Sequence, residues 1–296
     1  MKLVLLIFSY GNKYKIAGNR LKLQANELNI FNEIIYLNED TYPIYFKNFA
    51  KDHKKIVNKN TRGYGYWIWK PFILKWILNN YLEENDIVLY LDSGCEISKF
   101  GLDKFNNYIQ KTKKNGAYFF SNGFIESSWT KRDLIYRLNA IKHENKKQIQ
   151  ATFFFIKNTI KERELVNEWF KIAIEENYHY LDDTPSLIEN HKSFIEHRHD
   201  QSILSLLCNL RGYEVDKMSC LFNPKLYYKN SFILNYPIHA PRNFSNNSVF
   251  DGVIDKSEIN KVLSSRNKYK YLLLNFYFLT KLIIFRSIQN IKSKWM

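Results

Sequence analysis

Residues 87–94 read IVLYLDSG, an apolar run that ends in an aspartate, a serine and a glycine. A short run of this kind, with no polar alternation, is typical of a strand that is buried on both faces of a parallel sheet. Side chains directly after such a strand lie at its carboxyl end, where ligands bind in open α/β sheets. We therefore predict a buried strand at Ile87–Leu91 and a ligand site at Asp92–Gly94.

Similar apolar runs occur on both sides of this stretch and alternate with helical patterns. Strands are predicted at Leu3–Phe8, Ile34–Leu37, Ala117–Phe120 and Thr152–Ile156, and helices at Lys13–Leu28, from Pro71 onward, at Glu162–Glu175 and at Ile203–Leu210. Alternating strands and helices indicate an α/β fold, with a mostly parallel sheet flanked by helices. The rule that places ligands at strand ends also singles out Ser9-Tyr10-Gly11, directly after the first strand.

The composition fits a globular protein with a large domain. Of the 296 residues, 45% are hydrophobic and 25% are charged, which argues against disorder as the main state. We expect one α/β catalytic domain over residues 1–250 and a basic helical tail over residues 251–296. From Lys261 to Met296 the chain has eight Lys or Arg and no Asp or Glu, interleaved with apolar residues. Such a tail suits a helix that lies on an anionic membrane surface. The alternative is a helix packed against the domain.

The formal net charge of +15 indicates an anionic partner. Nucleic acid, acidic lipid, a sugar-phosphate donor and an acidic glycan all satisfy this condition. The three cysteines show no CxxC spacing, which favours a reducing compartment over a disulfide framework or a zinc site. The run Leu3–Phe8 is too short for a signal peptide, and no run of about 18 apolar residues occurs. We therefore expect a cytoplasmic protein, peripheral on the inner face of the cytoplasmic membrane if the tail binds lipid.

Asp92 is the first candidate ligand residue. A carboxylate held just beyond a buried strand suits a hard cation such as Mg²⁺ or Mn²⁺, which bridges to a diphosphate. Gly94 has no side chain, so that a ligand can approach the backbone closely there. The alternative is an ordinary Asp-Ser-Gly turn that closes the strand.

Residues 62–71, RGYGYWIWKP, form the second candidate. Pro71 is expected to open a helix, which places Lys70 at a helix N-terminus, where backbone N–H groups favour an anion. Arg62 and Lys70 are therefore candidate phosphate ligands, and Trp67 or Trp69 is a candidate wall for a sugar or a base. Alternatively, the aromatic side chains pack in the core and Lys70 is a solvated helix cap.

Residues 196–202, EHRHDQS, stand before the apolar helix predicted at Ile203–Leu210. Polar residues of several kinds at a helix start indicate a site rather than a core. Asp200 is a candidate general base, or an acceptor of a hydrogen bond from a sugar hydroxyl, and Gln201 and Glu196 are the accompanying catalytic candidates. In the alternative, Asp200 only caps the helix.

His239 lies between two prolines in residues 236–242, YPIHAPR, after a strand-like run at Phe232–Leu234. An imidazole held rigidly in this way is a candidate metal ligand. The alternative is a structural histidine, which is the more common role of a lone histidine.

Taken together and in this order, residues 63–71, 90–96 and 197–202 resemble the donor-site motifs of GT-A glycosyltransferases. The resemblance is to small bacterial enzymes of capsule and lipopolysaccharide synthesis in particular. It covers most of the chain ahead of the basic tail and implies a GT-A-like, Rossmann-like fold. Asp92 matches the first acid of the DxD motif of this family, and the position of the second acid is occupied here by Gly94.

The resemblance also implies a role for each matched residue. The loop Ser9–Gly11 takes the position that holds the nucleotide base, and Asp200 that of the acid near the acceptor and the reacting carbon. His239 resembles the late histidine that completes a metal site, and Glu96 is a candidate for the missing carboxylate. The implied donor site comprises Ser9, Tyr10, Gly11, Arg62, Trp69, Lys70, Asp92, Ser93 and Gly94, and the implied Mn²⁺ or Mg²⁺ site comprises Asp92, Glu96 and His239.

The implied function is transfer of a hexose from a nucleotide-diphosphate sugar, with a UDP-sugar as the expected donor. The expected acceptor is a glycan or a lipid-linked glycan in surface polysaccharide synthesis. Two other classes stay open. A nucleic-acid-binding protein would account for the net charge, although the basic residues are spread along the chain and no RNP1 or zinc-finger motif occurs, so that no nucleic acid is expected. A metal-dependent hydrolase or nuclease would use Asp92, Glu96, His199 and Asp200.

Overall fold

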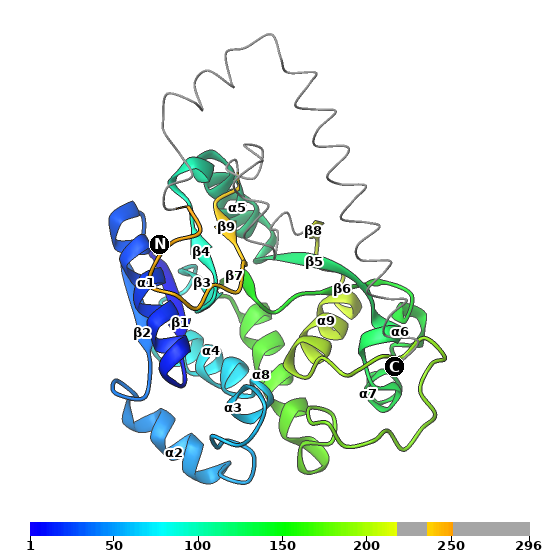
Figure 1. Cartoon of the computed structure of the whole chain (residues 1–296). Coiled ribbons are helices and arrows are strands. Elements are labelled where there is room, and N and C mark those ends of the chain that lie inside the picture. Colours follow the sequence, from blue (N-terminus) through cyan, green and yellow to red (C-terminus); the bar gives the residue numbers. More distant parts are fainter. Residues whose placement is uncertain (218–235, 251–296) are drawn as a thin grey trace.

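The computed structural model describes residues 1–217 and 236–250, which form an α/β domain around a mixed sheet (Figure 1). Within these two ranges the sheet has seven strands in the order β2-β1-β3-β7-β5-β6, with β8 pairing with β5. The strands of this sheet are β1 (Leu3–Phe8), β2 (Glu33–Leu37), β3 (Ile87–Asp92), β5 (Ala117–Ile125), β6 (Lys147–Ile149), β7 (Phe153–Lys157) and β8 (Val215–Lys217). A small second sheet pairs β4 (Glu96–Ile97) with β9 (Ile238–His239).

Strand direction changes across the main sheet. β1 runs parallel to β2 and β3, and β5 runs parallel to β8. β7 is antiparallel to β3 and to β5, and β5 is antiparallel to β6. The predicted α/β class is confirmed, and the sheet is mixed, with its longest parallel part at β2-β1-β3. Apolar runs of buried strands look alike in either direction, so that the sequence pattern does not encode the antiparallel pairings.

Helices cover both faces of the sheet, which is therefore the middle of three layers (Figure 1). One face packs against α1 (Asn12–Leu28) and α5 (Leu102–Asn115). The other face packs against α2 (Ile44–Asp52), α4 (Trp69–Asn80), α8 (Ile160–Ile174) and α9 (Asp200–Leu210). Shorter helices are α3 (Gly63–Tyr66), α6 (Glu126–Trp129) and α7 (Arg132–Arg137). In the part of the chain that the structure describes, no helix combines the length and the apolar character needed to cross a membrane.

The side chains of β1 and β3 alternate between two hydrophobic cores. Those that pack on the side of α4 and α8 are Val4, Leu6, Phe8, Val88 and Tyr90. Those that pack on the side of α1 and α5 are Leu3, Leu5, Ile7, Ile87, Leu89 and Leu91. Because successive residues of a strand face opposite sides, a sheet that is covered on both faces needs strands without polar alternation. This requirement is the physical origin of the two apolar runs from which the fold was predicted.

One predicted helix boundary is displaced, with a consequence for the site. α4 begins at Trp69 rather than at Pro71. Pro71 is tolerated there because the first N–H groups of a helix have no intrahelical partner. Lys70 therefore lies within the first helical turn, and its side chain is buried rather than solvated. The predicted tail at residues 251–296 and the strand-like run at Phe232–Leu234 lie outside the described residues.

Glu126, at the start of α6, is a fully buried carboxylate between α6, β6 and α9. It accepts hydrogen bonds from Thr130 Oγ1 (2.9 Å), Asn209 Nδ2 (3.1 Å), Gln148 Nε2 (3.4 Å) and the Ser205 hydroxyl. Burial raises the pKa of this carboxyl to about 7, although the four donors oppose the shift. Glu126 is therefore a buried group that titrates near neutral pH.

The folded protein is expected to lose stability as the pH rises through 7, because Glu126 then loses its proton. Because the pKa of Glu126 is higher in the folded state than its ordinary 4.5, its contribution is complete below pH 4.5 and is lost above pH 7. When the pH is raised from 5 to 8, the melting temperature of Glu126→Gln should fall by a few degrees less than that of the wild type. Glu164→Gln, at an exposed position of α8, is the control. An unchanged pH dependence in Glu126→Gln would contradict this assignment.

Candidate active site

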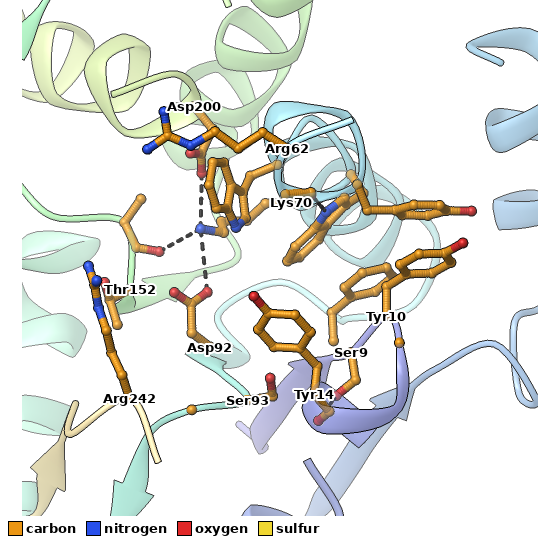
Figure 2. Close-up of a pocket in the computed structure, with 18 of the residues that line it drawn as sticks. Ser9, Tyr10, Tyr14, Arg62, Lys70, Asp92, Ser93, Thr152, Asp200 and Arg242 are labelled. Carbon is orange, nitrogen blue, oxygen red and sulfur yellow. Dashed lines mark hydrogen bonds and ion pairs between the residues drawn. The ribbon is translucent and has the colours of Figure 1, made fainter. Parts of the chain in front are cut away.

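The loops that follow β1 and β3 open into a cavity of about 660 Å³, a size that suits a small-molecule ligand. Figure 2 shows Asp92 and Lys70 in this cavity, with Tyr10, Arg62 and Arg242 around them. The lining also includes residues of the loop before α4, of the turn before β7 and of the start of α9. The cavity therefore unites the two strand ends that the sequence singled out with the predicted motifs at residues 62–71 and 196–202.

Strand pairing brings these segments to one edge of the sheet. β1 and β3 pair in parallel with Phe8 opposite Asp92, so that Ser9 and Ser93 follow at the same edge. β7 runs antiparallel to β3, and its amino end therefore lies at that edge too. The Asp92 N–H donates a hydrogen bond to the Thr152 carbonyl over 2.8 Å. The antiparallel strand thus adds Thr152 to a site that parallel strands alone would have built from their carboxyl ends.

Lys70 is the centre of a buried charge cluster in the cavity (Figure 2). Its Nζ lies 2.9 Å from Asp200 Oδ2 and 3.5 Å from Asp92 Oδ1, and it donates a hydrogen bond to the Ala151 carbonyl over 2.9 Å. The side chains of Lys70 and Asp200 are 3% and 5% exposed, whereas that of Asp92 is 33% exposed. The Lys70 ammonium therefore forms ion pairs with two carboxylates. Of these two, only the Asp92 carboxylate is open to a ligand.

Burial and mutual attraction act in opposite directions on this cluster. Burial alone would lower the pKa of Lys70, but the two carboxylates outweigh it and the pKa is raised. Burial raises the pKa of Asp200, the Lys70 ammonium opposes the rise, and the result is a pKa of about 6. Lys70 is therefore charged at neutral pH. Asp200 is a carboxylate that takes up a proton under mildly acidic conditions, a range suited to a general base.

A second residue of β3 also holds the Asp92 side chain in place. The Tyr90 hydroxyl donates a hydrogen bond to Asp92 Oδ1 over 2.5 Å. Burial raises the pKa of Tyr90 well above its ordinary value, so that the phenol stays protonated and remains a donor. Because Tyr90 and Lys70 both contact Oδ1, the second oxygen of Asp92 is left for a ligand.

Aromatic side chains form one wall of the cavity. Tyr10 and Tyr64 stack with their ring centroids 3.5 Å apart, and Trp69 stacks on Phe8 with centroids 3.9 Å apart. The Trp69 Nε1–H donates a hydrogen bond to the Gly63 carbonyl over 2.9 Å. All five residues line the cavity. Trp69 therefore lines the cavity, where it is held in the core rather than free to move onto a ligand.

The backbone of residues 63–67 lies in the left-handed region throughout, with φ between 51° and 98°. Such angles cost on the order of 1–3 kcal/mol for each residue other than glycine and persist only where the surroundings impose them. A Cβ added at Gly63 would lie 2.5 Å from the Trp67 ring, so that only glycine fits at that position. The two glycines of the predicted motif therefore build a strained loop that positions Tyr64 on the cavity.

The loop after β1 is held by internal hydrogen bonds. Ser9 Oγ donates to the Tyr14 carbonyl over 2.9 Å, and the Gly11 N–H donates to the Glu39 carboxylate. Gly11 has φ 85°, which glycine adopts without strain. Both predicted residues line the cavity together with Tyr10. The Ser9 side chain is already engaged within the protein, so that its part is to shape the loop.

Glu196, one of the predicted catalytic residues, is not part of the cavity lining. Its carboxylate lies 3.1 Å from Arg198 Nη2 and 3.6 Å from Arg62 Nη1. Both arginines do line the cavity. Glu196 therefore contacts two cationic side chains of the lining from outside the cavity, which gives it a positioning role. The contacts form because Arg62, just before α3, and Arg198, just before α9, both lie near the Glu196 carboxylate.

Gln201 lines the cavity beside Asp200 but is engaged by its neighbours. Its Nε2 donates a hydrogen bond to Gln148 Oε1 over 2.7 Å, and its Oε1 accepts one from the Ala151 N–H over 3.2 Å. These bonds hold the turn before β7, whose Ala151 carbonyl accepts the hydrogen bond of Lys70. Gln201 thus supports the charge cluster through the backbone.

His199, which precedes Asp200, has a φ of 54°, a strained backbone angle for a residue other than glycine. Its ring is buried and lines the cavity, and Nδ1 donates a hydrogen bond to the Leu181 carbonyl over 2.9 Å. Burial lowers the pKa of His199 to about 4, so that the ring is neutral and Nε2 is an acceptor. Within residues 1–217 and 236–250, Nε2 has no hydrogen-bond partner. Nε2 is itself buried and lies 3.6 Å from Asp183 Oδ1, so that the ring serves as part of the cavity wall.

The predicted metal ligands Asp92, Glu96 and His239 are not brought together. Glu96 is fully buried in β4 and accepts hydrogen bonds from several donors, among them Asn243 Nδ2 at 2.7 Å. His239 lies opposite Glu96 in β9 and donates from Nε2 to the Tyr236 carbonyl over 2.6 Å. Neither lines the cavity. Among the residues that the structure describes, no group of three or more His, Cys, Asp or Glu is arranged to hold a metal ion.

Gly94 stands where the second acid of a DxD motif would be, and the packing around it leaves little room for one. A Cβ at Gly94 would lie 3.2 Å from the Phe244 ring and 3.4 Å from Arg242 Cα. The Lys70 ammonium, 3.5 Å from Asp92, already brings positive charge to the remaining carboxylate. The residues present therefore do not fit a divalent cation held by the protein.

Some lining residues were not singled out from the sequence. They are Tyr14, Tyr64, Thr152, Arg198 and Arg242. Three of these residues lie inside the quoted motifs: Tyr64, Arg198 and Arg242. The aromatic ring of Tyr64 and the positive charge of the two arginines could have indicated a ligand site. Tyr14 and Thr152 have no such signal, because only the packing of α1 and the antiparallel β7 brings them to the cavity.

Comparison of the sequence with protein-family models gives no match, and comparison with curated proteins gives none either. Comparison with solved structures gives similarities at low identity. The chain is similar to the bifunctional glycosyltransferase WbbM in its apo form, with 13% identity and a TM-score of 0.44 over 90% of this chain and 44% of that one. The chain thus spans less than half the length of WbbM.

Two further solved structures complete the comparison. A glycosyltransferase involved in glycosylation of the major capsid of PBCV-1 has 10% identity and a TM-score of 0.43, over 81% of this chain and 94% of that one. The galactosyltransferase LgtC, in complex with donor and acceptor sugar analogues, has 14% identity and a TM-score of 0.38, over 69% of this chain and 70% of that one. With TM-scores below 0.5, these similarities assign no activity to this chain.

Proposed function

We propose that the protein is a glycosyltransferase that moves a sugar from a nucleotide-diphosphate sugar to a hydroxyl of a glycan or lipid-linked glycan. The observation that carries this proposal is the Asp92–Lys70–Asp200 cluster inside an aromatic and basic cavity at the ends of β1 and β3. Such a cavity supplies rings for a base, cations for a diphosphate and a carboxylate that takes up a proton near pH 6.

Tyr10 and Tyr64 are the proposed subsite for the nucleotide base. They are stacked at the cavity wall, and stacking of a base on an aromatic ring contributes about 1–3 kcal/mol. The bonded loop at Ser9–Gly11 keeps Tyr10 in place, and the strained loop at residues 63–67 keeps Tyr64 in place. The base would therefore meet a preformed surface, which limits the entropy lost on binding.

Asp200 is the proposed general base of the transfer. The acceptor hydroxyl oxygen forms a bond to the anomeric carbon, and the bond from that carbon to the diphosphate oxygen breaks. The electron pair of the broken bond leaves on the diphosphate, and the hydroxyl proton passes to the Asp200 carboxylate. Lys70 is a positioning residue that keeps Asp200 ionised at neutral pH.

The nucleotide subsite is tested with a thermal-shift panel of UDP, GDP and CMP and their common sugar conjugates, each with and without Mn²⁺. A ligand that binds only the folded state, at a hundred times its Kd, stabilises it by about 2.7 kcal/mol. We therefore expect a rise of several degrees in melting temperature for one nucleotide family. The rise should be much smaller in Tyr10→Ala and unchanged in the control Tyr81→Ala, which replaces an exposed tyrosine at the end of α4.

The outcomes separate the proposed function from its alternatives. No shift with any nucleotide, with or without Mn²⁺, would overturn it. Release of free sugar from the stabilising conjugate at a rate that acceptors do not change would favour a hydrolase instead. Salt-dependent binding of arbitrary oligonucleotides, without any nucleotide shift, would favour a nucleic-acid-binding protein.

A further inference from the structure

The buried helix α9, which begins at Asp200, carries a stripe of polar side chains along one side. The stripe comprises Gln201, Ser202, Ser205 and Asn209, whose spacing places them on the same side of the helix. Leaving a buried polar group without a hydrogen bond costs free energy, so that such a stripe needs partners. In α9 the partners are on α6 and β6. The stripe therefore determines how α9 lies against these two elements.

The Glu126 carboxylate of α6 is the centre of this interface. Its Oε1 accepts hydrogen bonds from the α9 side chains Ser205 and Asn209, and Gln148 Nε2 of β6 lies within 3.4 Å of both Glu126 Oε2 and Ser202 Oγ. In the part of the chain that the structure describes, Glu126 pairs with no cation, so that hydrogen bonds alone offset its burial. Burying a carboxylate is costly even then, and its directional contacts explain the residue better than a gain in stability does. We call the following set the α9 network: Glu126, Thr130, Gln148, Gln201, Ser202, Ser205 and Asn209.

The α9 network leads into the cavity. Gln148 Oε1 accepts a hydrogen bond from Gln201 Nε2 over 2.7 Å, and Gln201 Oε1 accepts one from the Ala151 N–H over 3.2 Å. The Ala151 carbonyl in turn accepts the hydrogen bond of Lys70. Asp200, whose Oδ2 lies 2.9 Å from Lys70 Nζ, directly precedes Gln201 in α9. The network thus reaches both partners of the ion pair: Asp200 through the helix, and Lys70 through hydrogen bonds.

We propose that Glu126 is a positioning residue for glycosyl transfer: from outside the cavity lining it fixes the start of α9 and, with it, Asp200. This inference rests on the proposed function. Apolar packing alone leaves a helix some freedom to slide or turn on a sheet, whereas directional hydrogen bonds specify one placement. A displacement of about 1 Å at a reacting group lowers a rate by on the order of 10²-fold. The placement of α9 therefore bears directly on proton transfer to Asp200.

The α9 network persists whether or not Glu126 carries a proton. Two of its partners, Ser205 and Thr130, are hydroxyls, and a hydroxyl donates to a carboxylate or accepts from a carboxylic acid. A glutamine at this position likewise offers one oxygen as an acceptor and one N–H group as a donor. Glu126→Gln should therefore keep most of the network, whereas Glu126→Ala leaves its donors unpaired.

The first experiment measures kcat and the KM of the sugar nucleotide that the thermal-shift panel identifies. We expect kcat to fall by on the order of 10–100-fold in Glu126→Ala and in Gln148→Leu, which breaks the network at nearly constant volume. The donor KM should stay within about twofold, because the proposed base subsite at Tyr10 and Tyr64 lies outside the network. Glu126→Gln should retain kcat within about threefold. The control is Phe105→Leu, a core substitution in α5 on the opposite face of the sheet.

The outcomes of this experiment separate positioning from general stability. A kcat in Glu126→Ala and Gln148→Leu equal to that of the control, with all variants folded, would overturn the inference and leave the proposed function standing. The same would follow from a loss in Glu126→Gln as large as in Glu126→Ala. A selective loss of kcat that Glu126→Gln restores would support it.

The second experiment needs no substrate and follows the titration of the Asp200 carboxyl by ¹³C NMR. The charged groups that face Asp200 are Lys70 of α4, which lowers its pKa, and Asp92 of β3, which raises it. In Gln148→Leu the ammonium should be held less firmly, so that the pKa of Asp200 rises above its value of about 6. Phe105→Leu should leave this pKa unchanged.

An unchanged pKa of Asp200 in Gln148→Leu would overturn the inference whatever the wild type catalyses. A wild type that transfers no sugar, with the pKa still raised in Gln148→Leu, would overturn the proposed function and leave the link from the α9 network to Asp200 standing.

Discussion

Asp200→Asn is expected to lower kcat for glycosyl transfer by roughly 10²–10⁴-fold, while nucleotide binding stays within a few-fold of the wild type. The amide keeps the shape of the side chain and cannot accept the proton of the acceptor hydroxyl. Lys70 retains Asp92 as an ion partner, 3.5 Å away, so that the cluster keeps a charged pair. The measurement is kcat and KM with the sugar nucleotide that the thermal-shift panel identifies.

The matched control is Asp103→Asn, which removes a carboxylate at an exposed position of α5, outside the cavity lining. It should leave kcat unchanged. Equal kcat in Asp200→Asn and the control, with both proteins folded, would rule out Asp200 as the base. A proportional loss of nucleotide binding and kcat in Asp200→Asn would instead make Asp200 a binding residue.

The pH dependence of the wild type belongs to the same prediction. The pKa of Asp200 is raised by burial to about 6, and the base is its ionised form. Activity should therefore be low below pH 6 and rise through pH 6 to a plateau, when kcat/KM is measured between pH 5 and pH 8. The Lys70 ammonium lowers this pKa, so that its removal should move the rise in activity to higher pH. A flat profile across pH 6 would contradict the role of Asp200.

Lys70→Met is expected to destabilise the protein by about 3–5 kcal/mol, because it breaks a buried ion pair by removing one partner. The Asp200 side chain, 5% exposed, would be left as a buried carboxylate without its cation, 2.9 Å away in the wild type. The melting temperature should fall by on the order of 10 °C. Transfer activity should fall as well, because the pKa of Asp200 would rise and less of it would be ionised at pH 7.

A double substitution tests this reason directly. Lys70→Met combined with Asp200→Asn removes the uncompensated charge, so that the double variant should be more stable than Lys70→Met alone, although it stays inactive. Lys75→Met, on the same helix and outside the cavity lining, is the control and should leave the melting temperature within a few degrees. If the losses of the two single variants simply add, Lys70 and Asp200 are not coupled, and the unpaired charge of Asp200 does not explain the loss in Lys70→Met.

The outline of the fold and the edge of the sheet that carries the cavity were predictable from a few residues. The apolar runs at Leu3–Phe8 and Ile87–Leu91 predicted β1 and β3, and the loops after them do line the cavity. The pattern works because a sheet covered by helices on both faces requires apolar residues at every position of its central strands. The direction of β7 and β6, which run opposite to β1 and β3, was not predictable, since direction leaves no mark on such a run.

The side chains at the candidate site were predicted unevenly. Asp92, Lys70 and Asp200 were all expected near a donor, but the ion pairs that make them one cluster join positions far apart in the sequence. Glu96 and His239 were expected as metal ligands, and the structure pairs them with each other in the small β4–β9 sheet, outside the cavity lining. Chemistry-bearing residue types can be read from a sequence, whereas the direction in which each side chain points depends on its neighbours in space.

By itself, then, the sequence determined the α/β class, the two central strands and the segments from which the cavity is built, because these follow from local patterns of burial and turn formation. Only the tertiary structure decided which of the candidate residues share the cavity. It buried Lys70 between two acids, packed a backbone against Gly94 and turned the Glu196 carboxylate toward two arginines. Apart from the contact of Glu196 with Arg198, which is local, these contacts are made between segments that are remote in the chain, where only the packing of the helices on the sheet determines the distances.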